Sequence, residues 1–191
     1  MKKRKVDSTL GIFRVLQHRG ILREAKLSAI FLIYFIISFA LFNLVFLLLN
    51  LDYYAGFYIA GIMKALLGGE VKTATVENKE LAALQIGPSE IVFSSLCTGL
   101  LELSVLVSAI IASRGIKIKK RIIGVAFATL TVFVFNIMRI YITVSFILSQ
   151  NLNEAEILHN ILFKSFLFVV IVGFYFLWFK WSTESEKRCK E

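Results

Sequence analysis

Apolar residues in this chain gather into four long runs, which are separated by shorter polar and basic stretches. The runs cover approximately residues 27–51, 91–112, 122–148 and 157–179. A helix needs about 20 consecutive apolar residues to cross the hydrocarbon core of a bilayer, and each run reaches that length. The pattern therefore predicts four transmembrane helices.

A fifth apolar stretch, residues 53–67, is shorter than the about 20 residues that a transmembrane helix needs, and it carries Lys64 near its end. It is rich in tyrosine, with Tyr53, Tyr54 and Tyr58 close together. Tyrosine is enriched where a membrane meets water. This stretch is predicted to form an interfacial helix that lies on the outer membrane surface.

The segment 52–90 is the one region with the character of a soluble domain. Residues 71–76 alternate and are β-branched, which predicts a strand, and residues 77–79 are a turn candidate. Residues 81–86 complete a predicted hairpin, although their composition is equally compatible with a helix. Glycine and proline mark both ends of this region, at Gly68-Gly69 and Gly87-Pro88. The predicted fold is an all-α integral membrane protein with four transmembrane helices, an outer interfacial helix and a small extracytoplasmic hairpin.

Basic residues border the apolar runs and predict how the chain is oriented. The sequence has 22 Lys and Arg against 13 Asp and Glu, a net charge of +9. The basic side chains cluster in residues 1–26, in the short loop 114–121 and after residue 180. Cytoplasmic flanks of transmembrane helices are enriched in Lys and Arg. Both termini and the loop are therefore predicted to be cytoplasmic, which requires an even number of spans.

These boundaries divide the chain into a basic cytoplasmic N-terminal segment (1–26), a single transmembrane catalytic domain (27–180) and a basic cytoplasmic tail (181–191). Hydrophobic residues make up 58% of the chain, above the 45–50% typical of soluble domains. The first run is longer than the apolar core of a signal peptide, so it is expected to be a retained anchor. Because the positive charge follows the spans, a nucleic-acid partner is not expected.

Three polar residues stand out because each lies near the outer end of a different apolar run. They are Cys97, Arg139 and His159. Placing an arginine at the centre of a transmembrane helix costs about 2.5–3.5 kcal/mol on translocon scales, so it normally faces a partner or a wet cavity. Asn136 and Thr143 share a helix face with Arg139, which favours a cavity. Each residue also has an ordinary interpretation: an inert buried thiol, a cation snorkelling to the interface, and an interfacial histidine.

Together the three residues suit thiol chemistry. A thiolate is the reactive form of cysteine, and both a helix N-terminus and a nearby cation favour it; Cys97 is expected within the first two turns of its helix. His159 is the candidate general base, and Arg139, always protonated, can hold an oxyanion or a thiolate. Supporting roles are considered for Asn136, Glu102, Glu156 and Asn160. Glu156 lies one turn before His159, and Glu102 is expected to pair with another helix. No metal-ligand cluster or phosphate-binding loop is present, so no cofactor is expected.

The order of these motifs on three successive spans resembles the exosortase/archaeosortase family. The motifs are Cys97-Thr98-Gly99, then Asn136-Ile137-Met138-Arg139, then His159, and the resemblance covers roughly residues 30–180. Members are multi-pass membrane transpeptidases with a Cys, Arg and His trio, in some of which Arg replaces the third residue. The length and composition of this chain look like a compact archaeal member.

The resemblance implies a substrate and a reaction. The substrates would be exported proteins with a C-terminal motif, one transmembrane helix and a basic tail. Cys97 would form a thioacyl intermediate at that motif, His159 would move the protons, and Arg139 would stabilise the oxyanion. A membrane lipid would be the acceptor, and the active site of this plasma-membrane enzyme would face the exterior.

Two other functions remain open at this point. The first is a small binding or transport module in which Arg139 and Glu102 hold an anionic or zwitterionic ligand. The second is a non-catalytic assembly subunit whose polar residues hold helices together. The three hypotheses differ in whether Cys97 is reactive and whether Arg139 is needed for folding.

Overall fold

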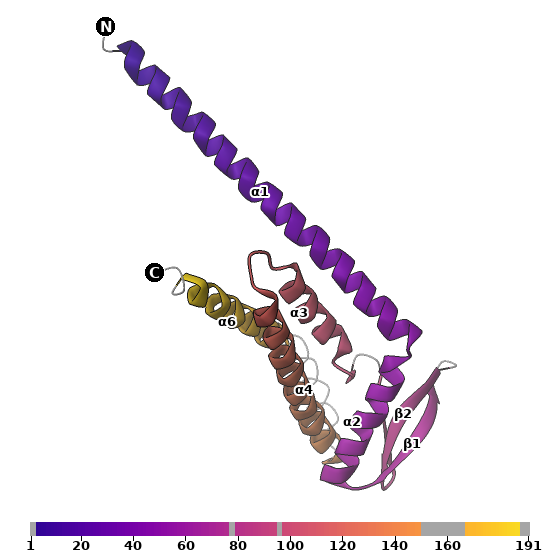
Figure 1. Ribbon diagram of the computed structural model, residues 1–191. Helices are drawn as coiled ribbons and strands as arrows, with labels where there is room; N and C mark the ends of the chain where they lie inside the picture. The colour runs from indigo at the N-terminus through magenta and orange to yellow at the C-terminus, as the bar shows by residue number, and fades with distance from the viewer. Residues whose placement is uncertain (1–2, 77–78, 95–96, 150–166, 188–191) are drawn as a thin grey trace.

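The computed structural model describes residues 3–76, 79–94, 97–149 and 167–187. Long helices dominate it, and a small antiparallel sheet lies at one end (Figure 1). The elements in chain order are α1 (Lys3–Leu48), α2 (Leu51–Leu67), β1 (Glu70–Val76), β2 (Lys79–Ile86), β3 (Ser89–Val92), α3 (Leu100–Ala112), α4 (Ile118–Leu148) and α6 (Leu167–Lys187).

Two of the described helices are long and apolar enough to cross a membrane. They are Ala25–Leu48, the second half of α1, and Ile118–Leu148, which is α4. The first and third apolar runs are thus confirmed as helices. None of Ala25–Leu48 is buried within the protein, and large side chains such as Ile37 and Leu41 are 59% exposed. An apolar helix that leaves this much surface uncovered is typical of contact with lipid.

The predicted helix 91–112 is wrong in its first third. Ile91 and Val92 belong to strand β3, and α3 begins only at Leu100. With 13 residues, α3 is about 20 Å long, which is less than the hydrocarbon core it was predicted to cross. Cys97 therefore precedes the helix instead of lying inside its first two turns. The error arose because Ile91, Val92 and Phe93 are as apolar as the helix that follows, and the polar residues from Ser94 to Gly99 were included in the run.

The small domain between α1 and α3 is larger than predicted. Helix α2 confirms the predicted helix over 53–67, and β1 confirms the strand over 71–76. Strand β2 confirms the second strand and extends it back to Lys79; the two other turn candidates, residues 77 and 78, lie outside the described residues. Strand β3 was not predicted. It pairs with β2 through Ala83↔Val92 and Ile86↔Ser89 after a turn at Gly87-Pro88, so a three-stranded sheet replaces the hairpin.

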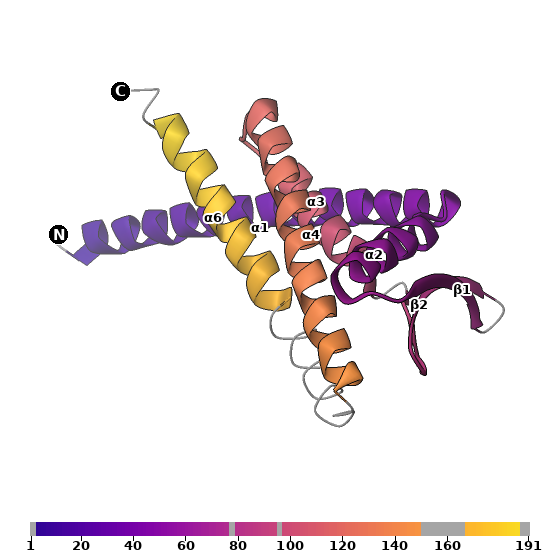
Figure 2. The ribbon, with the colours of Figure 1, turned by 90° about the horizontal axis from the view of Figure 1, so that it is seen from below.

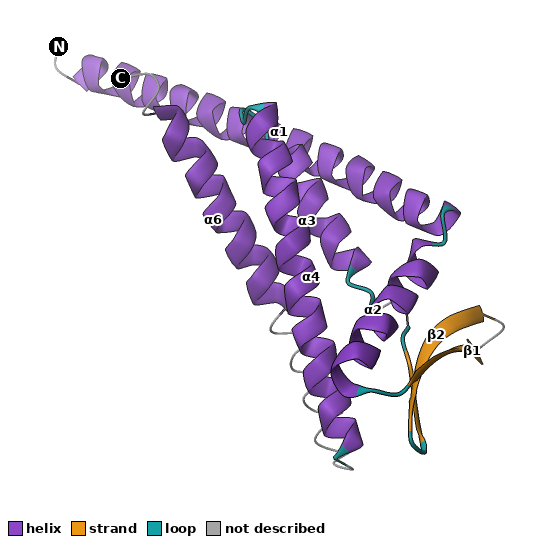
Figure 3. Ribbon diagram, turned by 60° about the horizontal axis from the view of Figure 1, so that its bottom comes forward, coloured by secondary structure: helices purple, strands orange, loops and turns teal. Residues whose placement is uncertain are grey.

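The chain reverses direction so that its basic regions gather at one end of the molecule. The short loop between α3 and α4 lies at the same end as the C-terminal end of α6, whereas the sheet and the last turns of α4 lie at the opposite end (Figures 1 and 3). The N-terminal part of α1 extends beyond the other helices on the side of the loop. The fourth run is helical from Leu167 onward, and its first ten residues lie outside the described residues.

Two hydrophobic clusters hold these parts together. One joins α2, the sheet and the end of α4, and includes Met63, Leu84, Phe93 and Val144. The other joins α3, α4 and α6 around Leu106, Ile110, Ala128 and Trp178. In the view from below, the sheet packs against α2 on the side away from α6 (Figure 2). On α4, Val132 belongs to the second cluster and Ile140 to the first. The buried polar residues Asn136 and Arg139 lie between them along the helix.

Candidate functional site

Cys97 lies on a short turn that links the sheet to α3. Its backbone N–H donates to the Ser94 carbonyl (2.8 Å), and its sulfur lies 3.6 Å from the Ser94 hydroxyl. Gly99 then caps α3 with φ = 75° and ψ = 3°. This left-handed conformation is readily adopted by glycine and disfavoured for residues with a Cβ. The turn therefore ends in a backbone shape that depends on Gly99.

Asn136 of α4 fixes this turn from the side of the helices. Its amide Nδ2 donates a 2.8 Å hydrogen bond to the carbonyl oxygen of Cys97. A Cβ placed on Gly99 would come within 3.1 Å of the Asn136 Cγ, so the two residues are in close contact. A backbone carbonyl that is withdrawn from water needs a hydrogen-bond partner. Asn136 supplies that partner for Cys97.

Arg139 lies one turn further along the same face of α4 and is buried, with 4% of its surface exposed. Its charge interacts with both Cys97 and Glu102. Glu102, in the first turn of α3, is 3% exposed. That Glu102 pairs with another helix stays a prediction, for which Arg139 of α4 is the candidate partner. The structure thus brings Cys97, Asn136, Arg139 and Glu102 together from three segments of the chain.

The depth of this group follows from the length of α4. Arg139 precedes the last residue of α4, Leu148, by nine positions, which is about 14 Å along the helix axis. The short helix α3 begins at the same level, because Leu100 follows the turn that Asn136 contacts. The polar group is therefore enclosed between helices and does not lie at the extreme end of the bundle. A low-dielectric position of this kind strengthens every electrostatic interaction within it.

One site residue was missed from the sequence. The Thr98 hydroxyl donates a 3.1 Å hydrogen bond to Oδ1 of Asp52, which lies in the first turn of α2. The same hydroxyl oxygen accepts a bond from the backbone N–H of Leu100 (3.4 Å). Asp52 precedes the Cys97 turn by more than forty residues, so no local pattern connects them. The sequence signal that could have identified Asp52 was its place as an acidic residue directly after the apolar run 27–51.

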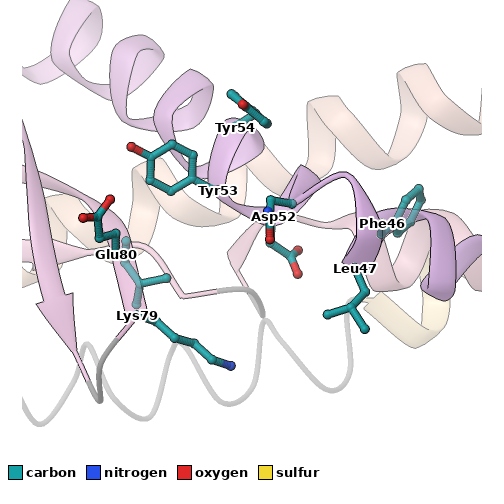
Figure 4. Close-up of a pocket in the computed structure, with 9 residues that line it drawn as sticks. Phe46, Leu47, Asp52, Tyr53, Tyr54, Lys79 and Glu80 are labelled. Carbon is teal, nitrogen blue, oxygen red and sulfur yellow. The ribbon is translucent and has the colours of Figure 1, made fainter.

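Asp52 also lines a pocket of about 560 Å³ at the junction of α1, α2 and β2 (Figure 4). Phe46, Leu47 and Leu81 make an apolar wall, and Tyr53 and Tyr54 add two phenol rings. Lys79 and Glu80 supply opposite charges at the start of β2. Cys97 does not line this pocket; Asp52 is the residue that links the pocket to the turn.

The other sequence candidates cannot be placed. His159, Glu156 and Asn160 lie outside the described residues. Within the part of the chain that the structure describes, no group of three His, Cys, Asp or Glu side chains is arranged to hold a metal ion. The chemistry available among the described residues is therefore that of a half-buried thiol with a buried guanidinium and a buried carboxylate nearby.

Comparisons with protein-family models, curated proteins and solved structures found no match.

Proposed function

We propose that this protein is a four-span membrane cysteine transpeptidase of the exosortase/archaeosortase kind. The observation that carries the proposal is the turn at Cys97, which is held by Asn136 and lies within the electrostatic reach of Arg139. A buried arginine near the turn can stabilise negative charge that develops there during the reaction. The enclosed position also excludes bulk water, which suits transfer of an acyl group to an amine in preference to hydrolysis.

The proposed topology places both termini and the loop 113–117 in the cytoplasm. It is supported by the gathering of the basic regions at one end of the molecule and of the sheet at the other. Helix α3 crosses only part of the bilayer, and the Cys97 turn completes the passage as an irregular segment enclosed by α2 and α4. The substrate helix would lie in the same bilayer, with its cleavage motif presented on the exterior side.

In the reaction, the Cys97 thiolate attacks the carbonyl carbon of the peptide bond at the cleavage motif. A sulfur–carbon bond forms, and the carbonyl oxygen becomes an oxyanion that Arg139 stabilises. When the intermediate collapses, the carbon–nitrogen bond breaks and the departing amine takes up a proton. His159 is proposed to receive the thiol proton and to deliver it to this amine.

A lipid amine then attacks the thioester carbonyl carbon. It loses a proton as its carbon–nitrogen bond forms, and the thiolate of Cys97 is released. The exported protein ends attached to the membrane lipid, while its original transmembrane helix and basic tail stay behind. Neither half of this reaction consumes an oxidant or a cofactor.

The proposal is tested by co-expression with a candidate exported protein that carries a C-terminal motif, a transmembrane helix and a basic tail. Wild type should shorten this substrate, and Cys97→Ala and Arg139→Ala should leave it at full length. Cys97→Ala should accumulate to the wild-type level, because the sulfur it removes is small and half-buried. Processing by Cys97→Ala at the wild-type rate would contradict the proposal.

A binding or transport module is the second candidate, favoured by the burial of Arg139 and Glu102. The carboxylate of Glu102 already opposes the charge of Arg139, so an anionic ligand would have to compete with it. Such a module should tolerate Cys97→Ala and lose function with Arg139→Ala. A non-catalytic assembly subunit should instead lose folding when Arg139 is replaced.

A further inference from the structure

The turn that carries Cys97 is held from two opposite sides by side chains from different helices. Asn136 of α4 bonds the carbonyl of Cys97, and Asp52 of α2 bonds the hydroxyl of Thr98, the next residue. Thr98 and Asn136 are both buried, with 9% and 8% of their surfaces exposed. Two such bonds to adjacent residues hold the turn that carries the thiol between α2 and α4.

Asp52 owes its position to the sharp reversal between α1 and α2. Asn50 adopts a left-handed conformation with φ = 49°, and its carbonyl accepts the backbone N–H of Tyr53 (3.0 Å). Asparagine is among the few non-glycine residues that adopt this conformation readily. The reversal places the first turn of α2 beside the start of α3, although the two are separated by the whole sheet in sequence.

Thr98 carries the effect of Asp52 to the backbone. Its hydroxyl donates to Asp52 and accepts from the N–H of Leu100, so one oxygen connects α2 to the first residue of α3. A hydroxyl that donates to a carboxylate becomes a better acceptor, because hydrogen bonds in a chain polarise one another. Removal of Asp52 would take away the bond that joins Thr98 to α2 and would weaken the hydroxyl as an acceptor for Leu100.

We propose that Asp52 is a positioning residue for the nucleophile, which acts through Thr98 to keep the Cys97 sulfur beside Arg139. The inference rests on the proposed function, in which the reactive thiol depends on the guanidinium. The described elements bring three charged side chains to this region: Asp52 from α2, Glu102 from α3 and Arg139 from α4. Asp52 is the one of the three that contacts the turn from the side of the pocket.

The test measures the rate at which N-ethylmaleimide labels Cys97 in the full chain in detergent, with Cys189→Ser as the background so that one thiol remains. Asp52→Ala should slow labelling about tenfold or more, because the turn loses its hydrogen bond to a charged group. Asp52→Asn, which removes the charge and keeps an acceptor oxygen, separates lost positioning from lost charge.

Conservative variants separate this role from general stability. Asp52→Asn keeps an acceptor oxygen without the charge and should label within about twofold of wild type, as should Thr98→Ser. Thr98→Val should resemble Asp52→Ala, and the double variant should be no slower than either, because both remove the same bond. Glu80→Gln is the matched control, since Glu80 lines the same pocket without contacting the turn.

Equal labelling of wild type and Asp52→Ala, or additive losses in the double variant, would overturn the inference. If Asp52→Ala does not fold, the Thr98→Val and Thr98→Ser pair decides the question. Arg139→Gln distinguishes this failure from that of the proposed function. Should labelling of wild type be no faster than that of Arg139→Gln, the thiol does not depend on the guanidinium and the proposed function falls. If Arg139→Gln slows labelling and Asp52→Ala does not, the proposed function stands and the positioning role of Asp52 is wrong.

Discussion

The side-chain amide of Asn136 donates a 2.8 Å hydrogen bond to the backbone carbonyl of Cys97. This bond joins α4 to the turn between β3 and α3, where Cys97 belongs to neither an α-helix nor a strand. Cys97 packs against the hydrophobic cluster of α2, the sheet and the end of α4, where an unpaired acceptor is costly. Asn136 is thus a structural partner for the turn, and it lies one helical turn before Arg139 on α4.

Asn136→Ala should lower the free energy of unfolding by about 1–3 kcal/mol, because the Cys97 carbonyl loses its partner. The variant should also label more slowly with N-ethylmaleimide. Thermal unfolding in mild detergent and the labelling rate measure the two effects. Thr129→Ala, which removes an exposed bond to Val125 on the same helix, is the control and should change neither quantity appreciably. Equal behaviour of the two variants would contradict the prediction.

Gly99→Ala tests the shape of the turn. The left-handed conformation costs about 1–2 kcal/mol for a residue with a Cβ, and the added methyl would also press on Asn136 at 3.1 Å. Gly115→Ala is matched, because Gly115 has a nearly equal φ of 79° but open space around it. Both variants should lose stability, and only Gly99→Ala should slow labelling of Cys97. Slower labelling in both would show that the effect is not local.

The sequence predicted the long helices and much of the small domain, because their patterns are local. Apolar length identified Ala25–Leu48 and Ile118–Leu148, and alternation identified β1. It did not predict β3, since Ile91 and Val92 look the same in a strand as in a helix. Asp52 was also missed, because its bond to Thr98 spans 46 positions and depends on the reversal at Asn50. Long-range contacts of this kind leave no periodic signal.

Glu102 and Arg139 should show coupled effects on stability. Removing one member of a buried charge pair leaves the other uncompensated and typically costs about 3–5 kcal/mol. Glu102→Gln and Arg139→Gln should each destabilise the protein, and the double variant should lose less than the sum of the two. A double-mutant cycle by thermal unfolding measures the coupling. Additive losses would show that the two side chains act independently.

Glu102→Gln and Arg139→Gln should have different effects on the rate at which N-ethylmaleimide labels Cys97. Arg139→Gln removes the buried positive charge near the turn, so labelling of Cys97 should slow. Glu102→Gln removes a negative charge that competes for Arg139, so labelling should be unchanged or faster. If Glu102→Gln slows labelling as much as Arg139→Gln does, the carboxylate has a direct role in activating the thiol.

Gly124→Ala should disturb the packing of α4 against α6. A Cβ on Gly124 would collide with the indole nitrogen of Trp178, which donates to the Lys120 carbonyl (3.2 Å). The expected loss is about 1–3 kcal/mol, the usual cost of overpacking. Gly173→Ala on α6 meets open space and should be neutral or slightly stabilising, since alanine favours helix more than glycine does. Thermal unfolding compares them, and equal melting temperatures would contradict the proposed contact.

The topology can be tested with single cysteines at the two ends of the molecule. Lys72 is exposed on β1, and Lys117 is exposed in the loop before α4. In a background with Cys97→Ser and Cys189→Ser, Lys72→Cys should react with a membrane-impermeant maleimide on intact cells. Lys117→Cys should react only after the cells are permeabilised, because its loop is predicted to be cytoplasmic. Labelling of both variants in intact cells would contradict the proposed topology, and labelling of Lys117→Cys alone would show that the orientation is inverted. Since the proposed substrate is an exported protein, the Cys97 turn would then face the wrong compartment, and the transpeptidase proposal would fail with it.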